Sequence, residues 1–270
     1  IDLISVAYGP GLLGPLLIGV NAAKMLALTL KKPLIGVNHV EAHLFAPFME
    51  RDEEIPFPSI GVLLSGGHTA ILKVNSFMDY QLIGQTVDDA IGEAFDKVAK
   101  MLQLPYPGGP EIERLAKEGD PLFYPFKGGK VKTNPYSFSL SGLKTKVLYT
   151  LSGQDQKLSN IKIPLITKQN IAASFQKAAF DDVVKKTLNA CKEHDCTTVL
   201  FGGGVTNNRR LREMFYEADS SKNWVFPPFS LTLDNAAMIA GLGAHRYLAT
   251  GKSDPLTLSP VTRIAFPKLL

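Results

Sequence analysis

The chain has few cysteines and no long uninterrupted apolar run, and both scarcities exclude classes of protein. Two cysteines among 270 residues are too few for a disulfide-rich secreted scaffold. The apolar stretch at residues 12–20 contains Gly14, Pro15 and Gly19 and is too short to cross a bilayer, so the sequence predicts no membrane partner. No signal peptide is visible either, and we therefore expect a cytoplasmic protein.

Net charge and cysteine spacing each leave more than one interpretation open. A formal charge of +4 permits an RNA or nucleotide partner, but many enzymes with neutral substrates are equally basic. Cys191 and Cys196 lie five residues apart around Glu193 and His194. This spacing is compatible with a zinc pair or a disulfide, although a reduced, half-buried helix end is the commoner explanation.

The most informative pattern in the chain is a pair of histidines four residues apart, His39 and His43. Residues 33–37 favour a short buried strand and Asn38 is a good N-cap, so both imidazoles fall on one face of a new helix. Such a face can hold one metal ion, although simple packing explains the pair as well. A zinc protease would need a glutamate beside one histidine, whereas Glu41 lies midway and is better explained as part of a capping box.

Alternating apolar and polar segments predict an α/β protein. Residues 3–8 and 33–37 favour strands around a helical stretch at residues 16–30, an order typical of a parallel sheet with a crossover helix. Residues 51–58 are polar, contain two prolines and are typical of a linker. The other predicted elements are a hairpin at 59–74, helices at 89–103, 111–118, 141–151, 170–194, 209 onward and 235–250, strands at 197–201 and 225–228, and an irregular surface insertion at 120–136.

Glycine-rich turns at residues 65–67, 107–110 and 202–204 favour nucleotide binding, because glycine lets backbone N–H groups approach a phosphate. None of the three is a P-loop or a dinucleotide fingerprint. Asp96 lies on the polar side of a predicted helix that Asp88 or Asp89 caps. It is a candidate for the ribose hydroxyls, or one of several solvated charges there. Asp234 is either the N-cap of the last helix or a third metal ligand.

Seven motifs occur together in one order along the chain. They are Asn38-His39-Val40-Glu41-Ala42-His43, Ser65-Gly66-Gly67-His68-Thr69, Gly92-Glu93-Ala94-Phe95-Asp96-Lys97, Tyr106-Pro107-Gly108-Gly109-Pro110, Phe138-Ser139-Leu140-Ser141-Gly142-Leu143-Lys144, Gly203-Gly204-Val205-Thr206-Asn207-Asn208 and Asp234-Asn235. In these motifs the chain resembles the TsaD family, the bacterial tRNA N6-adenosine threonylcarbamoyltransferases formerly called O-sialoglycoprotein endopeptidases.

The resemblance implies an actin-like ATPase-domain fold, shared with sugar kinases and heat-shock proteins, with two α/β domains around a nucleotide cleft. Residues 1–57 would be the remainder of the N-terminal domain, and residues 58–270 the C-terminal domain with a helical insertion at about 105–165. The family's opening strands are missing from the sequence, so we expect a fragment whose first domain is incomplete.

The resemblance also assigns roles by motif. The metal ligands would be His39, His43 and Asp234, holding one divalent ion per subunit, Fe2+ or Zn2+. The residues lining the phosphate and carbamoyl region of the substrate would be Leu63, Leu64, Ser65, Gly66 and Gly67. The residues binding the nucleoside part of an adenylate or ATP-type nucleotide would be Asp96, Gly109, Glu113 and Asn208. No general base can be named, and His68 is a candidate that a structural role in its turn explains equally well.

The implied reaction transfers the threonylcarbamoyl group from its adenylate to N6 of the tRNA adenosine beside the anticodon and releases AMP. The implied partners are tRNA, a paralogous TsaB-like subunit, a TsaE-like small ATPase and a TsaC-type synthase that makes the adenylate. Residues 14–28 would form the contact with the paralogue or belong to the core. Lys127, Lys130, Lys132 and Lys144 would meet tRNA phosphates or form a solvated face. The alternatives are a non-catalytic nucleotide-binding scaffold subunit and a metalloprotease.

Overall fold

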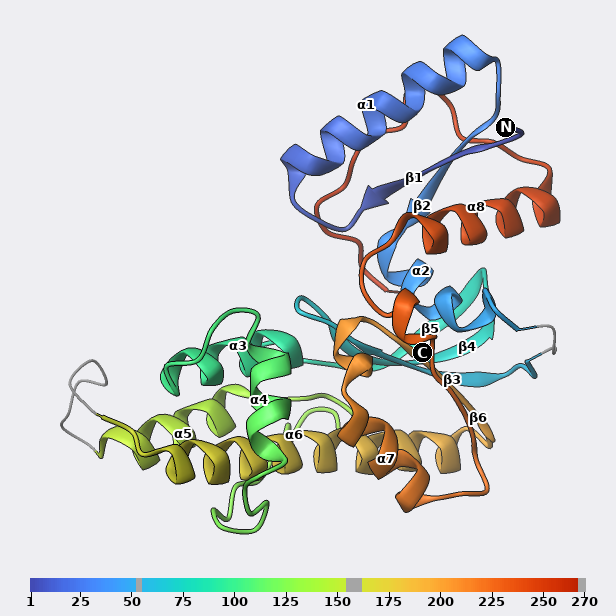
Figure 1. The fold of residues 1–270 in the computed structure, drawn as a ribbon. Coiled ribbons are helices and arrows are strands. Elements are labelled where there is room, and N and C mark those ends of the chain that lie inside the picture. Colours follow the sequence, from blue (N-terminus) through green and yellow to red (C-terminus); the bar gives the residue numbers. More distant parts are fainter. Residues whose placement is uncertain (52–54, 154–161, 267–270) are drawn as a thin grey trace.

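A computed structural model describes residues 1–51, 55–153 and 162–266. Its first sheet has two parallel strands, β1 (Ile4–Gly9) and β2 (Leu34–Asn38), joined by helix α1 (Leu13–Leu30). This confirms the strand–helix–strand unit expected at the start of the chain. Figure 1 shows the unit at the top of the molecule, with α1 lying across one side of the two strands.

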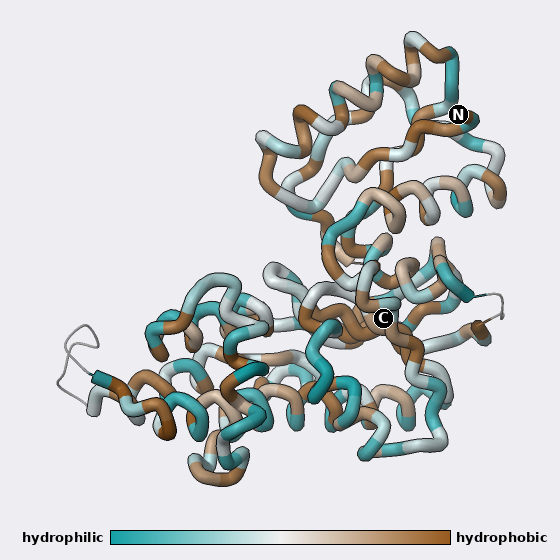
Figure 2. Tube along the Cα trace, in the orientation of Figure 1, coloured by the Kyte–Doolittle hydropathy of each residue, from teal (hydrophilic) through white to brown (hydrophobic). Residues whose placement is uncertain are grey.

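Helix α1 begins three residues earlier than its apolar period predicts. Pro15 falls in the first turn, where a missing N–H leaves no helical hydrogen bond unmade. Apolar residues run along much of α1 (Figure 2), and only Val20, Ala23 and Ala27 are buried. The length and mean hydropathy of α1 (1.6) would also allow it to cross a membrane, but a core helix or a signal sequence passes the same test.

The second sheet is mixed, with strand order β5-β4-β3-β6-β7. Its bounds are β3 (Ser59–Leu64), β4 (Thr69–Ser76), β5 (Asp79–Gln85), β6 (Thr198–Gly202) and β7 (Asn223–Val225). Strands β3 and β4 form the predicted antiparallel hairpin, and β3 pairs in parallel with β6. Every residue of β3 and β6 is buried, so these two strands form the centre of the fold.

Helices cover both faces of this sheet. On one face, Ile60, Val62 and Leu64 of β3 share a core with residues of α3 and α6. On the other face, Leu63 packs in a second core with Val40. The helices are α2 (His39–Phe45), α3 (Ile91–Met101), α4 (Gly108–Ala116), α5 (Ser141–Ser152), α6 (Leu165–Glu193), α7 (Arg209–Ala218) and α8 (Ala236–Thr250).

The last part of the chain returns to the first sheet. Helix α8 packs on β1 and β2, as Figure 1 shows. After α8, the backbone N–H groups of Asp254 and Val261 donate to the carbonyls of Leu34 and Tyr8. Residues 254–261 therefore lie beside the strands of the first sheet, a contact that no local pattern in the sequence predicts.

Several element boundaries differ from the prediction. Strand β5 was not predicted, because its residues lack a clear alternation of buried and exposed positions. Helix α4 begins at Gly108, inside the glycine-rich segment expected to be a loop. Helix α6 begins at Leu165, directly after Pro164, five residues before the predicted start. Cys191 and Cys196 are buried and free, which excludes the disulfide. Parts of the expected linker and helical insertion, residues 52–54 and 154–161, lie outside the described residues.

Candidate metal centre and nucleotide cavity

Helix α2 presents its two histidines as the spacing predicts. The Asn38 side chain accepts a hydrogen bond from the N–H of Val40 at 2.9 Å and so caps the helix, which confirms the predicted start. The rings of His39 and His43 lie 4.7 Å apart between centroids, nearly perpendicular to each other. His43 is buried, whereas His39 is partly open to solvent.

Asp234 completes a three-residue cluster with these histidines. Its Oδ1 lies 3.1 Å from Nε2 of His43 and 3.4 Å from Nε2 of His39. The N-cap of α8 is Asn235, whose side chain accepts from the N–H of Met238. Of the two roles the sequence left open for Asp234, the structure therefore excludes the cap and places the carboxylate between the imidazoles.

The donor set of this cluster suits a metal ion. Two imidazole nitrogens and a carboxylate oxygen lie within 4.8 Å of one another, a combination that borderline divalent metals accept. Hydrogen bonds with His39 and His43 hold the pKa of Asp234 well below its usual range, so it is a carboxylate at neutral pH. The side chain of Asp234 is 78% exposed, which leaves one side of the cluster open to a substrate.

Glu41 faces away from this cluster. Its carboxylate accepts a hydrogen bond from the hydroxyl of Tyr80 instead of closing the predicted capping box. Burial raises the pKa of Glu41 above its ordinary value, although the Tyr80 hydrogen bond opposes that change. The position of this side chain agrees with the argument from helix geometry against a zinc-protease arrangement.

The glycine turn after β3 lies close to the histidines. Inside it, the Ser65 Oγ accepts from the N–H groups of Gly67 and His68 at 3.3 and 3.0 Å. Burial lowers the pKa of His68, and the nearby imidazoles of His39 and His43 lower it further. The side chains of Leu63 and Leu64 are fully buried in the two cores, so only their backbone atoms can face a ligand.

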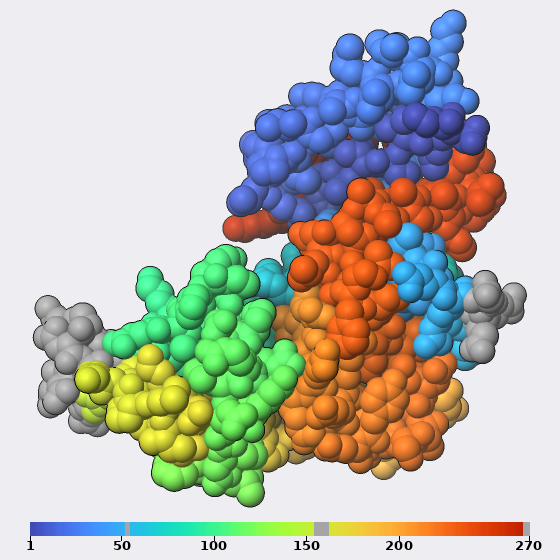
Figure 3. All heavy atoms as spheres, viewed as in Figure 1, coloured from blue at the N-terminus to red at the C-terminus, as the bar shows by residue number. Residues whose placement is uncertain are grey.

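A cavity of about 360 Å³ opens beside this turn. The four residues predicted to bind a nucleoside line it together with Gly66: Asp96, Gly109, Glu113 and Asn208. They come from α3, α4 and the segment before α7, so the fold brings together three stretches that are distant in sequence. Figure 3 shows the face on which α4, in green, meets the segment around α7, in orange.

The walls of the cavity are held by hydrogen bonds to the same side chains. Asp96 Oδ1 accepts from the N–H of Gly108 at 2.7 Å, where a Cβ would collide with Ala99 at 2.4 Å. Asn208 caps α7 and donates to Gln176 at 2.9 Å. Glu113 Oε1 accepts from the backbone N–H of Arg209 at 3.0 Å. Each of these side chains therefore already has a fixed position before any ligand binds.

Several lining residues were not predicted from the sequence. Tyr106 and Pro107 lie three and two residues before the predicted Gly109, and Asn207 directly precedes Asn208, so proximity to a motif is the signal that would have found them. Leu233 is more informative, because it lines the cavity and its neighbour Asp234 belongs to the histidine cluster. The cavity and the cluster are thus adjacent.

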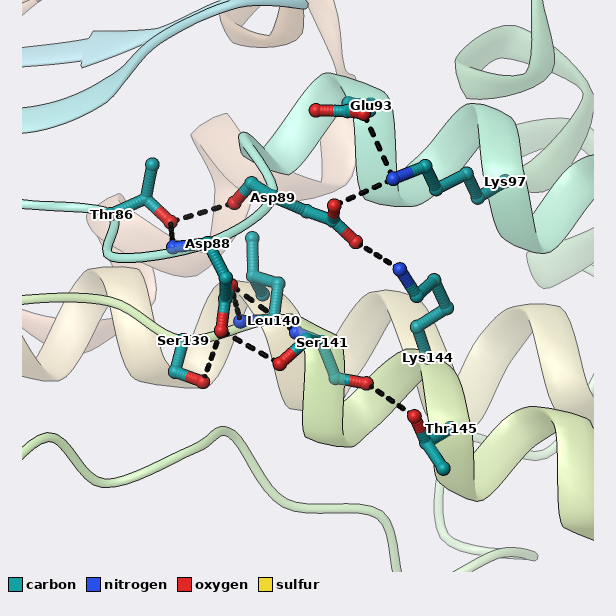
Figure 4. Close-up of polar contacts among 10 residues, drawn as sticks. All are labelled: Thr86, Asp88, Asp89, Glu93, Lys97, Ser139, Leu140, Ser141, Lys144 and Thr145. Atoms are coloured by element: carbon teal, nitrogen blue, oxygen red, sulfur yellow. Dashed lines mark hydrogen bonds and ion pairs between the residues drawn. The ribbon is translucent and has the colours of Figure 1, made fainter.

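A polar network joins the start of α3 to α5 (Figure 4). The predicted cap of α3 is wrong, because Ala90 occupies that position and both neighbouring aspartates bind elsewhere. Asp88 accepts from the backbone N–H groups of Leu140 and Ser141, at the start of α5. Asp89 forms ion pairs with Lys97 and Lys144, so Lys144 already has a carboxylate partner.

The family model of the tRNA N6-adenosine threonylcarbamoyltransferase TsaD matches residues 1–241. The chain belongs to the TsaD family. Proteins of that name are 57% identical to it in Protochlamydia amoebophila strain UWE25, over 97% of this chain and 77% of the relative. The identity is 51% in Chlamydia muridarum, over 92% and 72%, and 46% in Thermosipho africanus, over 98% and 78%. The predicted family and its transferase activity are confirmed.

Two solved structures of HypF share the fold. The crystal structure of T. kodakarensis HypF aligns with a TM-score of 0.68 and 15% identity over 93% of this chain and 41% of the other. Full-length HypF in a phosphate- and nucleotide-bound form aligns with a TM-score of 0.61 and 14% identity over 84% and 38%. At this identity the match concerns the fold alone, an α/β architecture of the actin-like ATPase type with a mixed sheet.

Proposed function

We propose that the histidine cluster and the adjacent cavity form one active site for threonylcarbamoyl transfer to tRNA. The adenylate of the donor would occupy the cavity, and its carbamoyl end would lie towards His39, His43 and Asp234. The observation that carries this proposal is the adjacency of Leu233, a wall of the cavity, and Asp234, a member of the cluster.

Each group of side chains has a defined task in this arrangement. Asp96 and Glu113 would accept hydrogen bonds from the ribose hydroxyls, while Gly109 and Asn208 shape the nucleoside pocket. Ser65, Gly66 and Gly67, with the backbone of Leu63 and Leu64, would line the phosphate and carbamoyl region. Because glycine has no side chain, the turn lets the donor lie against the backbone.

The cluster would hold one divalent ion, Fe2+ or Zn2+. Bound there, the ion would act as a Lewis acid on the carbamoyl carbonyl and anchor the oxygens of the donor. His39, His43 and Asp234 supply the negative charge and the neutral nitrogens that such an ion needs. AMP is a good leaving group, so the main work of the protein is to position the amine of the tRNA adenosine against the donor. His68 is the candidate base for the proton of that amine.

We further propose a two-domain layout around the cleft, with residues 1–57 in the first domain and residues 58–270 in the second. The second would carry the helical insertion at about 105–165, while α8 returns to pack on β1 and β2. The expected setting is the cytoplasm, with the TsaB-like, TsaE-like and TsaC-type partners of the family. The exposed apolar side chains of α1, among them Ile18 and Met25, support a contact with the paralogue there.

The decisive experiment substitutes the cluster and measures metal and transfer separately. In the full-length protein, His39→Ala combined with His43→Ala should abolish most bound metal and most threonylcarbamoyl transfer, with an unchanged circular dichroism spectrum. The matched control is His245→Ala, because His245 packs on Phe77 5.0 Å away and does not belong to the cluster. Full transfer by the metal-free double variant would overturn the proposal.

A second substitution separates the cavity from the cluster. Asp96→Asn should weaken binding of AMP while leaving the metal content unchanged. If Asp96→Asn lowers the metal content as strongly as the histidine variants, the cavity does not have a distinct nucleoside role.

A further inference from the structure

An exposed aromatic side chain, Phe229, lies four residues before Leu233, which lines the nucleotide cavity. Phe229 begins the short 3-10 helix Phe229–Leu231, in the segment that leads to Leu233 and Asp234. Its side chain is 52% exposed. Large exposed aromatic rings are costly to hydrate, so a ring beside an active site is a candidate contact for a ligand.

Two arginines from α7 lie over this ring. The guanidinium carbon of Arg212 is 4.1 Å from the centre of the Phe229 ring, and that of Arg209 is 5.9 Å away. Arg212 also donates to the carbonyls of Thr206 and Pro227 at 2.8 and 2.9 Å. These two hydrogen bonds fix the guanidinium plane, so the aromatic and cationic groups form a preorganised surface. We call Phe229, Arg209 and Arg212 the rim cluster.

Within the part of the chain that the structure describes, the guanidinium groups of the two arginines of the rim cluster have no carboxylate partner. Arg210, on the same helix, pairs with Glu213 and Glu217. Across residues 1–51, 55–153 and 162–266, by contrast, no carboxylate forms an ion pair with Arg209 or Arg212. An aromatic ring with unpaired arginines complements RNA, whose bases stack on rings and guanidinium planes and whose phosphates attract the charge.

The rim cluster is also linked to two walls of the cavity. Arg209 follows Asn208, which lines the cavity, and its backbone N–H donates to Glu113 on the opposite wall. To bring the N6 of its target adenosine to the donor, the tRNA must unstack that nucleotide from the anticodon loop. The neighbouring base then loses a stacking partner and can stack on another flat ring.

We infer that the rim cluster binds a nucleotide flanking the target adenosine, with its base stacked on Phe229 and a phosphate held by Arg209. This inference rests on the tRNA transferase activity proposed above and extends it to a recognition site outside the cavity. It assigns Phe229 a role in binding the RNA, separate from the donor and the metal.

The test measures binding of an anticodon stem-loop RNA to the full-length protein. Phe229→Ala should raise its Kd by about 5- to 150-fold, the range expected for the loss of one base–aromatic stack. Phe229→Trp, which keeps a flat ring, should bind within about threefold of the wild type. The matched control is Tyr149→Ala, because Tyr149 is 57% exposed but lies on α5. Arg209→Gln should lower the slope of log Kd against log salt by about one.

Two accompanying measurements distinguish this inference from the proposed function. AMP binding and metal content should remain unchanged in Phe229→Ala, so their loss would indicate that the substitution disturbs the active site itself. Unchanged RNA binding by Phe229→Ala would overturn the inference. If Phe229→Ala binds RNA normally but no longer binds a partner protein, the inference is also overturned, and the rim cluster is a protein interface.

Discussion

The hydroxyl of Tyr80 donates a hydrogen bond to the carboxylate of Glu41, on the side of α2 that faces away from the imidazoles. Both residues line a separate cavity of about 580 Å³ together with Arg246. Glu41 is the only carboxylate in the motif at residues 38–43. Its side chain binds Tyr80 of strand β5 and not the cluster of His39, His43 and Asp234. This hydrogen bond links α2 to the second sheet.

This contact predicts the behaviour of Glu41→Gln. The glutamine carbonyl can still accept from Tyr80, so α2 should keep its position, and the metal content and transfer rate should remain within about twofold of the wild type. In a zinc protease the same change removes the general base, which typically contributes 10²–10⁴-fold to the rate. A hundredfold slower transfer with full metal content would show that Glu41 takes part in the chemistry.

The neighbours Asp234 and Asn235 give a second, sharper prediction. Asp234→Asn keeps the shape of the side chain but removes the charge that a divalent ion needs, so metal affinity should fall by at least about tenfold. Competition with a chelator of known affinity measures this change. Asn235→Asp is the comparison variant, because aspartate is also a good N-cap and the Asp234 carboxylate remains. Aspartate cannot donate to the carbonyls of Leu231 and Leu233 as the Asn235 amide does, so we expect some loss of metal affinity, but a smaller one than in Asp234→Asn.

Exchanging Asp234 and Asn235 tests whether the metal site needs the carboxylate at position 234 or only a carboxylate somewhere in this loop. The double variant with Asp234→Asn and Asn235→Asp has the same charge as the wild type but places the carboxylate one residue later. It should fold with a capped α8 and bind metal as poorly as Asp234→Asn alone. Wild-type affinity in the double variant would mean that any carboxylate near this loop suffices.

The same two residues show how much of the site the sequence could predict. The spacing of His39 and His43 and the capping residue Asn38 act within one turn of helix, and the structure confirms all three positions. Asp234 lies 191 residues beyond His43, so no local pattern could distinguish a cap from a ligand. The resemblance to TsaD supplied that role.

Long-range contacts also explain what was missed in the fold. The predicted cap at Asp88 or Asp89 obeyed the local rules, yet both side chains bind groups more than 50 residues away in sequence. The buried positions of Leu63 and Leu64 follow from a sheet covered on both faces, which the hairpin pattern alone does not reveal. Short-range patterns therefore predicted the elements, whereas their tertiary partners required the structure.

Asp88 provides a pH-dependent prediction. Burial acts to raise the pKa of Asp88, but hydrogen bonds from Ser139, Leu140 and Ser141 outweigh it and lower the pKa below the ordinary 3.8. The unfolded state therefore binds protons more readily than the folded state. The stabilising contribution of Asp88 is present above about pH 4 and is lost as the pH falls through the lowered pKa.

Asp88→Ala should accordingly lower the free energy of unfolding by about 1–2 kcal/mol at neutral pH, because its carboxylate accepts from two backbone N–H groups at the start of α5, as a capping side chain would. The difference from the wild type should shrink as the pH falls below about 4, and urea titrations at several pH values would measure it. The matched control is Asp181→Ala, because Asp181 is exposed and forms an i,i+4 ion pair with Lys177 on its own helix. A difference that stays constant with pH would show that the Asp88 charge is unimportant.

At Gly203 both the backbone dihedral angles and a neighbouring carbonyl exclude a side chain. Its φ is +93° with ψ near 157°, a conformation that is essentially restricted to glycine, and an added Cβ would lie 2.4 Å from the carbonyl oxygen of Leu64. Gly203→Ala should therefore lower the free energy of unfolding by at least about 3 kcal/mol. Thermal unfolding should show a Tm decrease of roughly 6–12 °C.

The substitution should also affect the site, because Gly204 lines the nucleotide cavity and Leu64 ends the strand that leads to the glycine turn. AMP binding measured well below the new Tm should be weaker than in the wild type. Gly67→Ala is the matched control for stability, since its Cβ would meet nothing within 4 Å and its φ is not positive. If both variants unfold at the same temperature, the strained turn at Gly203 does not hold β3 and β6 together at the cavity wall.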